Sequence, residues 1–366
     1  MHILVTNDDG PPSLQSSPYI LPFVHALRAA GHKVTIVIPD AQRSWIGKAH
    51  IVGAEIHSTP YWPPERTPSA HDPEAQTARQ QRDGGGDGDA RPWILLSSTP
   101  ATCVQIALSH YLDTHDVDLV ISGPNYGRNT TAVFALSSGT LGAALEAAVC
   151  GHRAIALSFA FSSRNHDDEI IAETCRHSVR VCEYLAADAG GNFWGEGRLY
   201  TINTPVVAGV ASKPTIWTRM LQNSWKRGAC FQEIPASSED PTFSDAAHDA
   251  NAAAEEQMTR VQTEEGGKPP PQADEGRNGQ QKDSWERTRH FKWAPRFTDV
   301  FDSVEAAGPG TDGWSVKVGE TSVTGIYANF KHVQGLEGEI ELGGGQQVSL
   351  GRAKAAASSP AAAERL

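Results

Sequence analysis

Short runs of Val, Ile and Leu alternate along the chain with longer stretches in which apolar residues recur every three or four positions. The short runs predict buried strands. The longer stretches predict helices with one buried side, which Ile20, Phe23 and Leu27 mark in the first of them. Strands are predicted over residues 3–5, 33–38, 93–96, 118–122, 154–160, 198–203 and 322–330, and helices over 18–31, 99–112, 141–150 and 169–187.

The order of these elements predicts the fold class. A strand, a helix and a second strand in succession form a crossover, which implies that the two strands are parallel. Strands and helices alternate in this way up to about residue 205. We therefore predict an α/β fold: a doubly wound, mostly parallel sheet with helices on both faces, Rossmann-like, with polar insertions.

Two polar stretches interrupt the pattern. Residues 63–92 are rich in Gly and Pro, and residues 235–286 contain almost no aliphatic side chains, so both are predicted to be disordered insertions. Hydrophobic residues make up only 39% of the chain, which fits such insertions on a smaller core. We predict one domain over residues 1–330 and a C-terminal extension over 331–366, with a disordered end.

Polar side chains follow three of the predicted strands. Asp8 and Asp9 come directly after the first strand, Ser44 lies in the loop after the second, and Asn125 follows the strand 118–122. Ligands bind outside the carboxyl ends of the strands in such sheets. Two carboxylates, a hydroxyl and an amide oxygen suit a hard divalent ion such as Mg²⁺ or Mn²⁺. Taken singly, each has a plainer interpretation as an acidic turn, a loop residue or a turn-stabilising amide.

A second half of the site is predicted where the helix 141–150 begins. Ser138 is placed as its N-cap, with free backbone N–H groups just beyond, and Gly139 would allow close approach of an anion. A metal at one edge and a helix N-terminus at the other would hold a phosphoryl group between them. The same residues could instead form only a cap and a close packing contact. Glu146, in this helix, could be a buried partner or a solvated charge.

Charge and cysteine content narrow the function classes. The chain has 31 Lys and Arg against 43 Asp and Glu, a net charge of −12, and no basic stretch that could follow a nucleic-acid polymer. A small anionic substrate would need a metal ion to offset the repulsion from this negative charge. The five cysteines show no Cys-x-x-Cys spacing, which favours reduced thiols and a cytoplasmic location. Neither a signal peptide nor a membrane-spanning run is expected.

Five motifs taken together go beyond these arguments. They are Ile3–Gly10 (ILVTNDDG), Pro39–Ser44 (PDAQRS), Ser98–Val104 (STPATCV), Ser122–Asn129 (SGPNYGRN) and Ser138–Glu146 (SGTLGAALE). In this order they resemble the SurE (survival protein E) family of metal-dependent nucleotidases and acid phosphatases. The resemblance extends over roughly residues 1–60, 93–230 and 290–330.

The resemblance implies specific roles. Family metal ligands match Asp8, Asp9, Ser44 and Asn125, the same four that the strand ends select. Family positions lining the phosphate pocket match Asn129, Ser138 and Thr140. Family members hydrolyse nucleoside monophosphates, and they form dimers or tetramers, so a homodimer or homotetramer is expected here. The segment 11–18 and Thr102 depart from the family pattern, which leaves the substrate preference open.

The predicted function is therefore a metal-dependent phosphomonoesterase acting on nucleoside monophosphates and other small phosphate esters. Its predicted catalytic residues are Asp8, Asp9, Asn129, Ser138 and Thr140, with Gly139 also at the phosphate. Attack by water and attack by Asp8 through a phospho-enzyme both remain open. The alternative is a non-catalytic nucleotide- or metal-binding α/β protein. A dinucleotide-dependent oxidoreductase is disfavoured because no Gly-x-Gly-x-x-Gly follows the first strand.

Overall fold

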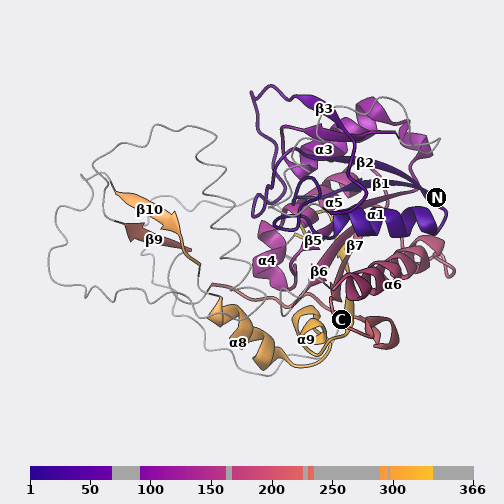
Figure 1. Ribbon diagram of the computed structural model, residues 1–366. Coiled ribbons are helices and arrows are strands. Elements are labelled where there is room, and N and C mark those ends of the chain that lie inside the picture. Colours follow the sequence, from indigo (N-terminus) through magenta and orange to yellow (C-terminus); the bar gives the residue numbers. More distant parts are fainter. Residues whose placement is uncertain (68–90, 162–166, 226–229, 235–288, 296, 333–366) are drawn as a thin grey trace, which may run out of the picture. The chain divides into compact units, whose positions relative to one another are not determined.

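The computed structural model describes residues 1–67, 91–161, 167–225, 230–234, 289–295 and 297–332 (Figure 1). Its contacts divide the chain into two units, Met1–Ala328 and Asn329–Leu366. The predicted insertion 235–286 lies outside the described residues, as do most of the predicted insertion 63–92 and most of the extension 331–366.

The described residues form a nine-stranded sheet around β1. In spatial order its strands are β3 (Ser58–Tyr61), β4 (Trp93–Leu96), β2 (Lys33–Pro39), β1 (His2–Thr6), β5 (Leu119–Tyr126), β6 (Ala154–Ala160), β7 (Arg198–Pro205), β11 (Thr321–Tyr327) and β8 (Thr215–Trp217). The strands from β4 through β7 pair in parallel, whereas β3 and β11 pair antiparallel with β4 and β7. The predicted doubly wound, mostly parallel α/β fold is confirmed.

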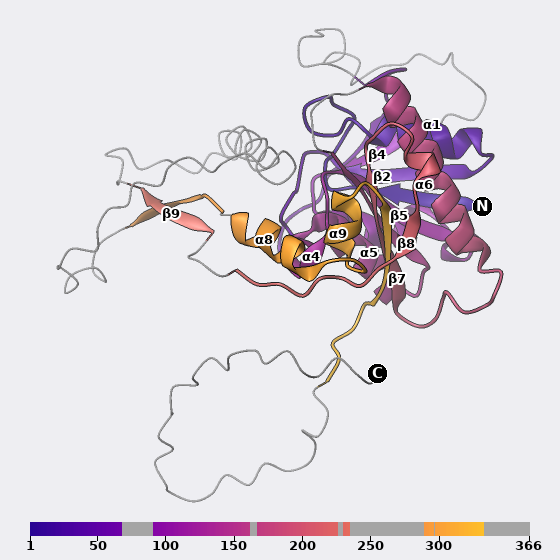
Figure 2. The ribbon, with the colours of Figure 1, turned by 90° about the horizontal axis from the view of Figure 1, so that it is seen from below.

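Helices cover both faces of the sheet (Figures 1 and 2). On one face, α1 (Ile20–Ala29) packs beside α6 (Asp168–Ala187), and on the other, α3 (Pro100–Ile106) packs beside α5 (Gly139–Val149). The remaining elements are α4 (Thr131–Ser137), α8 (Thr298–Ala307), α9 (Asp312–Lys317), the short helical turns 107–111, 114–116 and 210–212, and a separate antiparallel pair, β9 (Phe231–Ile234) and β10 (His290–Trp293).

The side chains of β1 show why this strand lies at the centre. Ile3 and Val5 belong to the apolar cluster under α1 and α6, whereas Leu4 belongs to the cluster under α3 and α5. All three side chains have no exposed surface. Successive side chains of a strand point to opposite faces, so three consecutive apolar residues require cover on both sides. The strand is thereby held in the middle of the sheet, with its carboxyl end at one fixed edge.

The strand order reverses at that edge, which is where a sheet of this kind leaves a crevice. From β1 the chain adds β2 and β4 on one side and then β5, β6 and β7 on the other. The loops after β1 and β5 therefore lead away in opposite directions, which leaves room between the carboxyl ends of the two strands. Ligands of open α/β sheets bind at such a switch point.

Several element predictions were wrong in detail. Residues 123–126 are not loop, because β5 continues through a register irregularity between Ser122 and Asn125 and ends at Tyr126. The last strand ends at Tyr327 and not at residue 330. The elements that the sequence pattern did not predict are β3, β8, β9, β10, α4 and α8. All five cysteines are free thiols, as predicted.

Helix lengths bear on the membrane prediction. Within the described ranges, no single helix is both long and apolar enough to cross a membrane. Only α4 and α5 taken together reach the required length and composition, and this pair is bent by 70°.

Candidate active site

Asp8 and Asp9 lie in a tight turn that directly follows β1, and both are buried. Asn7 shapes the turn: its Nδ2 donates to the carbonyl of Gly10 at 2.8 Å, and its Oδ1 accepts from the Gly10 N–H at 3.1 Å. An Asn side chain that closes such a turn on its own backbone holds the residues between in one conformation. The two carboxylates are therefore fixed at the carboxyl end of the central strand.

The carboxylate of Asp8 is bound at the start of α5. Its Oδ1 accepts from Thr140 Oγ1 at 2.7 Å, and its Oδ2 accepts from the Thr140 N–H at 3.2 Å. A helix N-terminus favours an anion because its first N–H groups have no intrahelical partner and the helix dipole is positive there. The anion at this helix end is a side chain of the protein itself.

This arrangement corrects the prediction of free N–H groups beyond Ser138. Ser138 is the N-cap of α5, as predicted, and its Oγ accepts from the Leu141 N–H at 3.1 Å. The Thr140 N–H is engaged by Asp8. Two of the donors expected to hold a phosphate thus have partners within the protein, because a capping hydroxyl and a carboxylate already satisfy them.

Gly139 allows this close approach. A Cβ added at Gly139 would lie 2.9 Å from both Cβ and Oδ2 of Asp8, and 3.0 Å from Cγ2 of Ile46. Real Cβ atoms essentially never approach heavy atoms so closely. The missing side chain therefore lets the helix start lie against the carboxylate.

Asp9 and Asn125 connect β1 to the end of β5. The Oδ2 of Asp9 accepts from the Tyr126 N–H at 2.6 Å. The Nδ2 of Asn125 donates to the Gly127 carbonyl at 2.8 Å, so its Oδ1 is the atom left for a ligand among the described residues. Asn125 pairs with Ser158 of β6 in the sheet register. These contacts place two carboxylates and an amide at the switch point.

Ser44 lies at this edge because the preceding residue, Arg43, is hydrogen-bonded to Asp8. The Arg43 N–H donates to the carbonyl of Asp8 at 2.7 Å, which brings the loop after β2 against the acidic turn. Ser44 itself is half-buried, and its Oγ accepts from Gln42 Nε2 at 3.5 Å. The structure thus brings Ser44 to the same edge as Asp8, with its hydroxyl bonded to Gln42.

Residues 43–50 form a strap along α5, and Glu146 is one of the residues that hold it there. The Gly47 N–H donates to the Ser137 carbonyl at 3.0 Å, and a Cβ at Gly142 would collide with the carbonyl of Gly47. Lys48 forms an ion pair with the buried Glu146. Of the two interpretations left open for Glu146, the buried partner is correct.

Hydrogen bonds decide the ionisation of Glu146. Burial by itself would raise the pKa of this carboxyl, but hydrogen bonds from Lys48 and Gln105 outweigh it. The pKa of Glu146 therefore lies below its ordinary value, with the positive charges of Lys48 and His50 acting in the same direction. An ionised Glu146 keeps the strap that carries Ser44 attached to α5.

Asn129 lies on the far side of the crevice, next to β6 and β7. Its N–H donates to Oδ1 of Asn203 at 2.8 Å, and its Nδ2 donates to Ser158 Oγ at 2.9 Å. The Nδ2 of Asn203 is buried and has no hydrogen-bond partner among the described residues. A buried amide donor without a partner costs free energy unless a ligand or water satisfies it, so Asn203 is a candidate binding residue. Sequence reasoning missed it, although it also lies near a strand end.

Asp312 is a second residue whose place sequence reasoning missed. It is fully buried, and its carboxylate accepts from the Thr131 N–H at 2.8 Å and the Leu221 N–H at 3.0 Å. Burial raises the pKa of Asp312, against the effect of these backbone hydrogen bonds. Thr131 has a positive φ of 69° and begins α4 two residues after Asn129. Asp312 therefore holds an unusual turn that leads out of the site.

The donor set fits a hard divalent ion, and it depends on neutral oxygens. In the part of the chain that the structure describes, no three His, Cys, Asp or Glu side chains gather into a metal-binding group. Asp8 and Asp9 supply two carboxylates, and Asn125 Oδ1 and Ser44 Oγ supply neutral oxygens at the same edge. A ligand set of two carboxylates and additional neutral oxygens suits Mg²⁺ or Mn²⁺ better than it suits Zn²⁺, which prefers nitrogen and sulfur ligands.

Comparison with known proteins identifies the family. The family model described as Survival protein SurE matches residues 3–227, which include Asp8, Asp9, Ser44, Asn125 and the start of α5. The chain belongs to the SurE family. The resemblance carried by the five sequence motifs is thereby confirmed.

Relatives within the SurE family carry different names. The chain is 34% identical over 242 residues to the probable tubulin–tyrosine ligase PBY1 of Saccharomyces cerevisiae, covering 62% of this chain and 31% of that protein. It is 32% identical over 220 residues to the 5'-nucleotidase SurE of a Synechococcus strain, covering 60% of this chain and 66% of the relative. The match to the 5'-nucleotidase SurE of Desulfovibrio desulfuricans is 34% over 206 residues, 56% of this chain and 66% of the relative. The chain thus spans less than a third of the yeast protein.

A solved SurE structure has the same fold. The crystal structure of the SurE protein from Aquifex aeolicus superimposes with a TM-score of 0.53 at 20% sequence identity. The superposition covers 90% of this chain and 95% of the Aquifex chain. At this identity the likeness supports the fold, and the chemistry must be argued from the site itself.

Proposed function

We propose that this SurE-family chain is a divalent-metal-dependent phosphomonoesterase that hydrolyses nucleoside monophosphates and other small phosphate esters. The observation that carries the proposal is the Asp8 carboxylate, held by Thr140 at the N-terminus of α5 and adjacent in the chain to the buried Asp9. Two buried carboxylates at a switch point are costly unless a cation or donors balance them. The names of the bacterial relatives point to the same substrate class.

The hydrogen bonds of Asp8 support a role as a ligand and not as the nucleophile. Each of its oxygens accepts a hydrogen bond from Thr140, which withdraws charge from both. We infer that water attacks the phosphoryl group and that Asp8 holds the metal together with Asp9, Asn125 and Ser44.

The metal would supply Lewis-acid polarisation of the phosphoryl oxygens and offset the charge of the acidic edge. The chain's own groups would orient the substrate. Asn129 is bonded to Ser158 of β6 and Asn203 of β7, and the Asn203 Nδ2 is a donor without a partner among the described residues. Because α5 binds Asp8, phosphate binding should depend strongly on the metal. Loss of the metal should therefore abolish both binding and turnover.

The test is phosphate release from a panel of nucleoside monophosphates and p-nitrophenyl phosphate, with Mg²⁺ or Mn²⁺, then with EDTA, then with metal restored. We expect release that EDTA abolishes and metal restores. Asp8→Asn should abolish turnover while thermal unfolding shows an intact fold, because the substitution removes one of the two negative charges that would balance the cation. The matched control is Asp116→Asn, an exposed acid on the short turn before β5.

Two outcomes would contradict the proposal. Undiminished turnover by Asp8→Asn would remove Asp8 from the mechanism. Absence of release with any metal, from folded protein, would favour a non-catalytic nucleotide- or metal-binding protein. Equilibrium dialysis with a nucleoside monophosphate then separates the two cases, because the binding protein would retain the nucleotide unchanged.

A further inference from the structure

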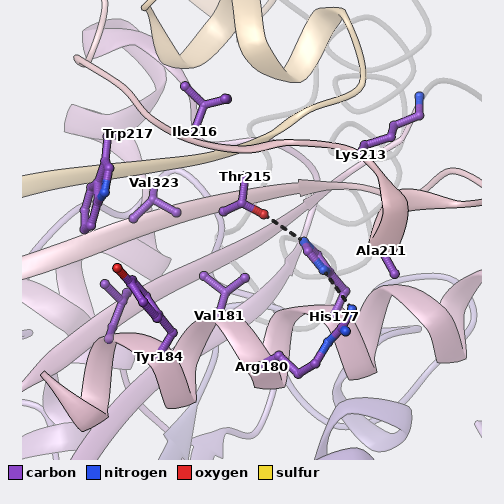
Figure 3. A pocket seen from close by; sticks show the side chains of 11 residues that line it. His177, Arg180, Val181, Tyr184, Ala211, Lys213, Thr215, Ile216, Trp217 and Val323 are labelled. Carbon is purple, nitrogen blue, oxygen red and sulfur yellow. Dashed lines mark hydrogen bonds between the residues drawn. The ribbon is translucent and has the colours of Figure 1, made fainter. Parts of the chain in front are cut away.

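A cavity of about 410 Å³ lies between α6 and the edge strand β8 (Figure 3). Its floor is apolar and is formed by Val181 and Leu185 of α6 and Val323 of β11. It shares no lining residue with the candidate active site, which lies at the carboxyl ends of β1 and β5. Its volume is within the range of roughly 300–1,000 Å³ typical of small-molecule sites.

One end of the cavity is cationic. Arg180 on α6 and Lys213 just before β8 both line it, and the side chain of Lys213 extends away from Arg180 and lies against Gly319 (Figure 3). Considering the described ranges only, neither forms an ion pair. The neighbouring acid on α6, Glu173, uses its oxygens to accept from the N–H groups of Gly209 at 2.9 Å and Ala211 at 3.2 Å. Two exposed cations therefore belong to the lining of a cavity whose floor is apolar.

His177 adds an oriented polar group to this end. Arg180 donates to its Nδ1 at 3.4 Å, so the proton of the neutral ring is on Nε2. Nε2 lies 3.1 Å from Thr321 Oγ1. It also lies 3.3 Å from Thr215 Oγ1 (Figure 3). Donation from Nε2 leaves the Thr215 hydroxyl hydrogen available to a ligand.

The other end of the cavity is aromatic. Trp217 and Tyr184 lie together there in Figure 3, and they are 51% and 60% exposed. Phe193 supports both, with ring centroids 5.5 Å from Trp217 and 5.4 Å from Tyr184. Large aromatic side chains held in place by a neighbour, yet half exposed, are typical of binding surfaces.

We propose that this cavity is a second binding site, for a small organic anion that carries a planar ring. The anionic group would lie against Arg180, where the long side chain of Lys213 would turn to meet it, and the ring would pack against Trp217 over the apolar floor. Arginine and lysine bind carboxylate, sulfonate or phosphate groups through charge-assisted hydrogen bonds. Separation of cations and aromatics to opposite ends demands a ligand with both features, so neither a simple inorganic anion nor a neutral ring fills the site.

The probe for the test is 2-naphthoate, an aromatic carboxylate that a phosphomonoesterase cannot turn over. Its binding is measured by isothermal titration calorimetry on the full chain, with neutral 2-naphthamide and with acetate as comparison ligands. We expect saturable 1:1 binding of 2-naphthoate and weaker binding of both comparison ligands. Partly exposed ion pairs each change affinity about twofold to fivefold. Arg180→Ala and Lys213→Ala together should therefore weaken binding about tenfold.

Matched variants localise the site. Arg176→Ala removes the same charge from an exposed position on the same helix and should leave the affinity unchanged. Trp217→Leu should weaken the binding of 2-naphthoate without changing the binding of acetate. Thermal unfolding of each variant confirms the fold, and all four positions are exposed. The proposal is overturned if 2-naphthoate does not saturate below its solubility limit, if 2-naphthamide binds as tightly, or if the double variant binds like the parent chain.

Discussion

Thr140 donates a hydrogen bond from its hydroxyl to Oδ1 of Asp8 at 2.7 Å, across 132 residues of sequence. Its backbone N–H donates to the other oxygen of the same carboxylate at 3.2 Å. One residue of α5 thus orients the acid that follows the central strand. Residues that orient a metal ligand matter nearly as much as the ligand, and their removal costs roughly 10–100-fold in metal affinity or activity.

Thr140→Val should therefore raise the Mg²⁺ concentration needed for half-maximal phosphate release by about tenfold or more. Thr140→Ser keeps the hydroxyl and should restore most of the affinity. The matched control is Thr174→Val in α6, which removes another buried hydroxyl whose partner is the Ile170 carbonyl at 2.8 Å. If both valine variants titrate with Mg²⁺ alike, Thr140 does not act through Asp8.

Gly139→Ala should disturb the same contact by steric overlap. The added Cβ would lie 2.9 Å from Cβ and Oδ2 of Asp8, and both groups are buried, so neither has room to move away. Overpacking of this kind costs about 1–3 kcal/mol. We expect a lower urea midpoint together with a large loss of activity. Gly190→Ala is the control, because its added Cβ would have its nearest contact at 3.6 Å, in an exposed turn.

The elements that the sequence predicts well are those with two-sided burial or clear helical periodicity. Ile3 to Val5 in β1 and the face of α1 are of this kind, and both are where the pattern placed them. The edge strands β3 and β8 have mostly exposed residues, so no apolar run marks them. Helix α4 is buried over most of its length and shows no polar side, which removes the periodic signal.

The candidate site was predictable as a set of strand ends but not as a set of contacts. Asp8, Asp9 and Asn125 follow from topology alone, because parallel strands bring their carboxyl ends to one edge. Gly123 and Pro124 are typical turn residues, so the sequence predicted a loop where β5 in fact continues to Tyr126. The pairs Thr140–Asp8 and Lys48–Glu146 join distant parts of the chain, and no local pattern encodes such partners.

Lys48 and Glu146 should show coupled effects on stability. Glu146 is buried at the side-chain carboxylate, whereas Lys48 is partly exposed, so loss of either leaves the other poorly compensated. In a double-mutant cycle of Lys48→Met and Glu146→Gln, we expect about 1–3 kcal/mol of coupling in the free energy of unfolding. The surface pair Lys317 and Glu305 provides the matched cycle and should give about 0–1 kcal/mol.

The same pair should also affect the site, because Lys48 holds the strap that carries Ser44. Lys48→Met is expected to weaken metal binding, seen as a higher half-maximal Mg²⁺ concentration for phosphate release, with a smaller change in the KM for substrate. Equal metal titrations for Lys48→Met and the parent chain would show that the strap stabilises the fold without positioning Ser44.

His177 should make the fold sensitive to mild acid. Burial lowers its pKa below the ordinary 6.5, the positive charge of Arg180 acts in the same direction, and Glu173 opposes both. The folded chain therefore binds a proton at His177 less readily than the unfolded chain does. The resulting stability is fully present above pH 6.5 and is lost as the pH falls from there through the lower folded pKa.

His177→Gln keeps a neutral donor toward Thr321 but cannot take up a proton. Urea midpoints measured between neutral pH and mild acid should therefore fall less steeply for this variant than for the parent chain. His57→Gln, at an exposed position, should leave the slope unchanged. Two results would contradict this prediction. One is a urea midpoint of the parent chain that stays constant below pH 6.5, and the other is a midpoint of His177→Gln that equals that of the parent chain at every pH. Either result would show that His177 titrates alike in the folded and unfolded chains.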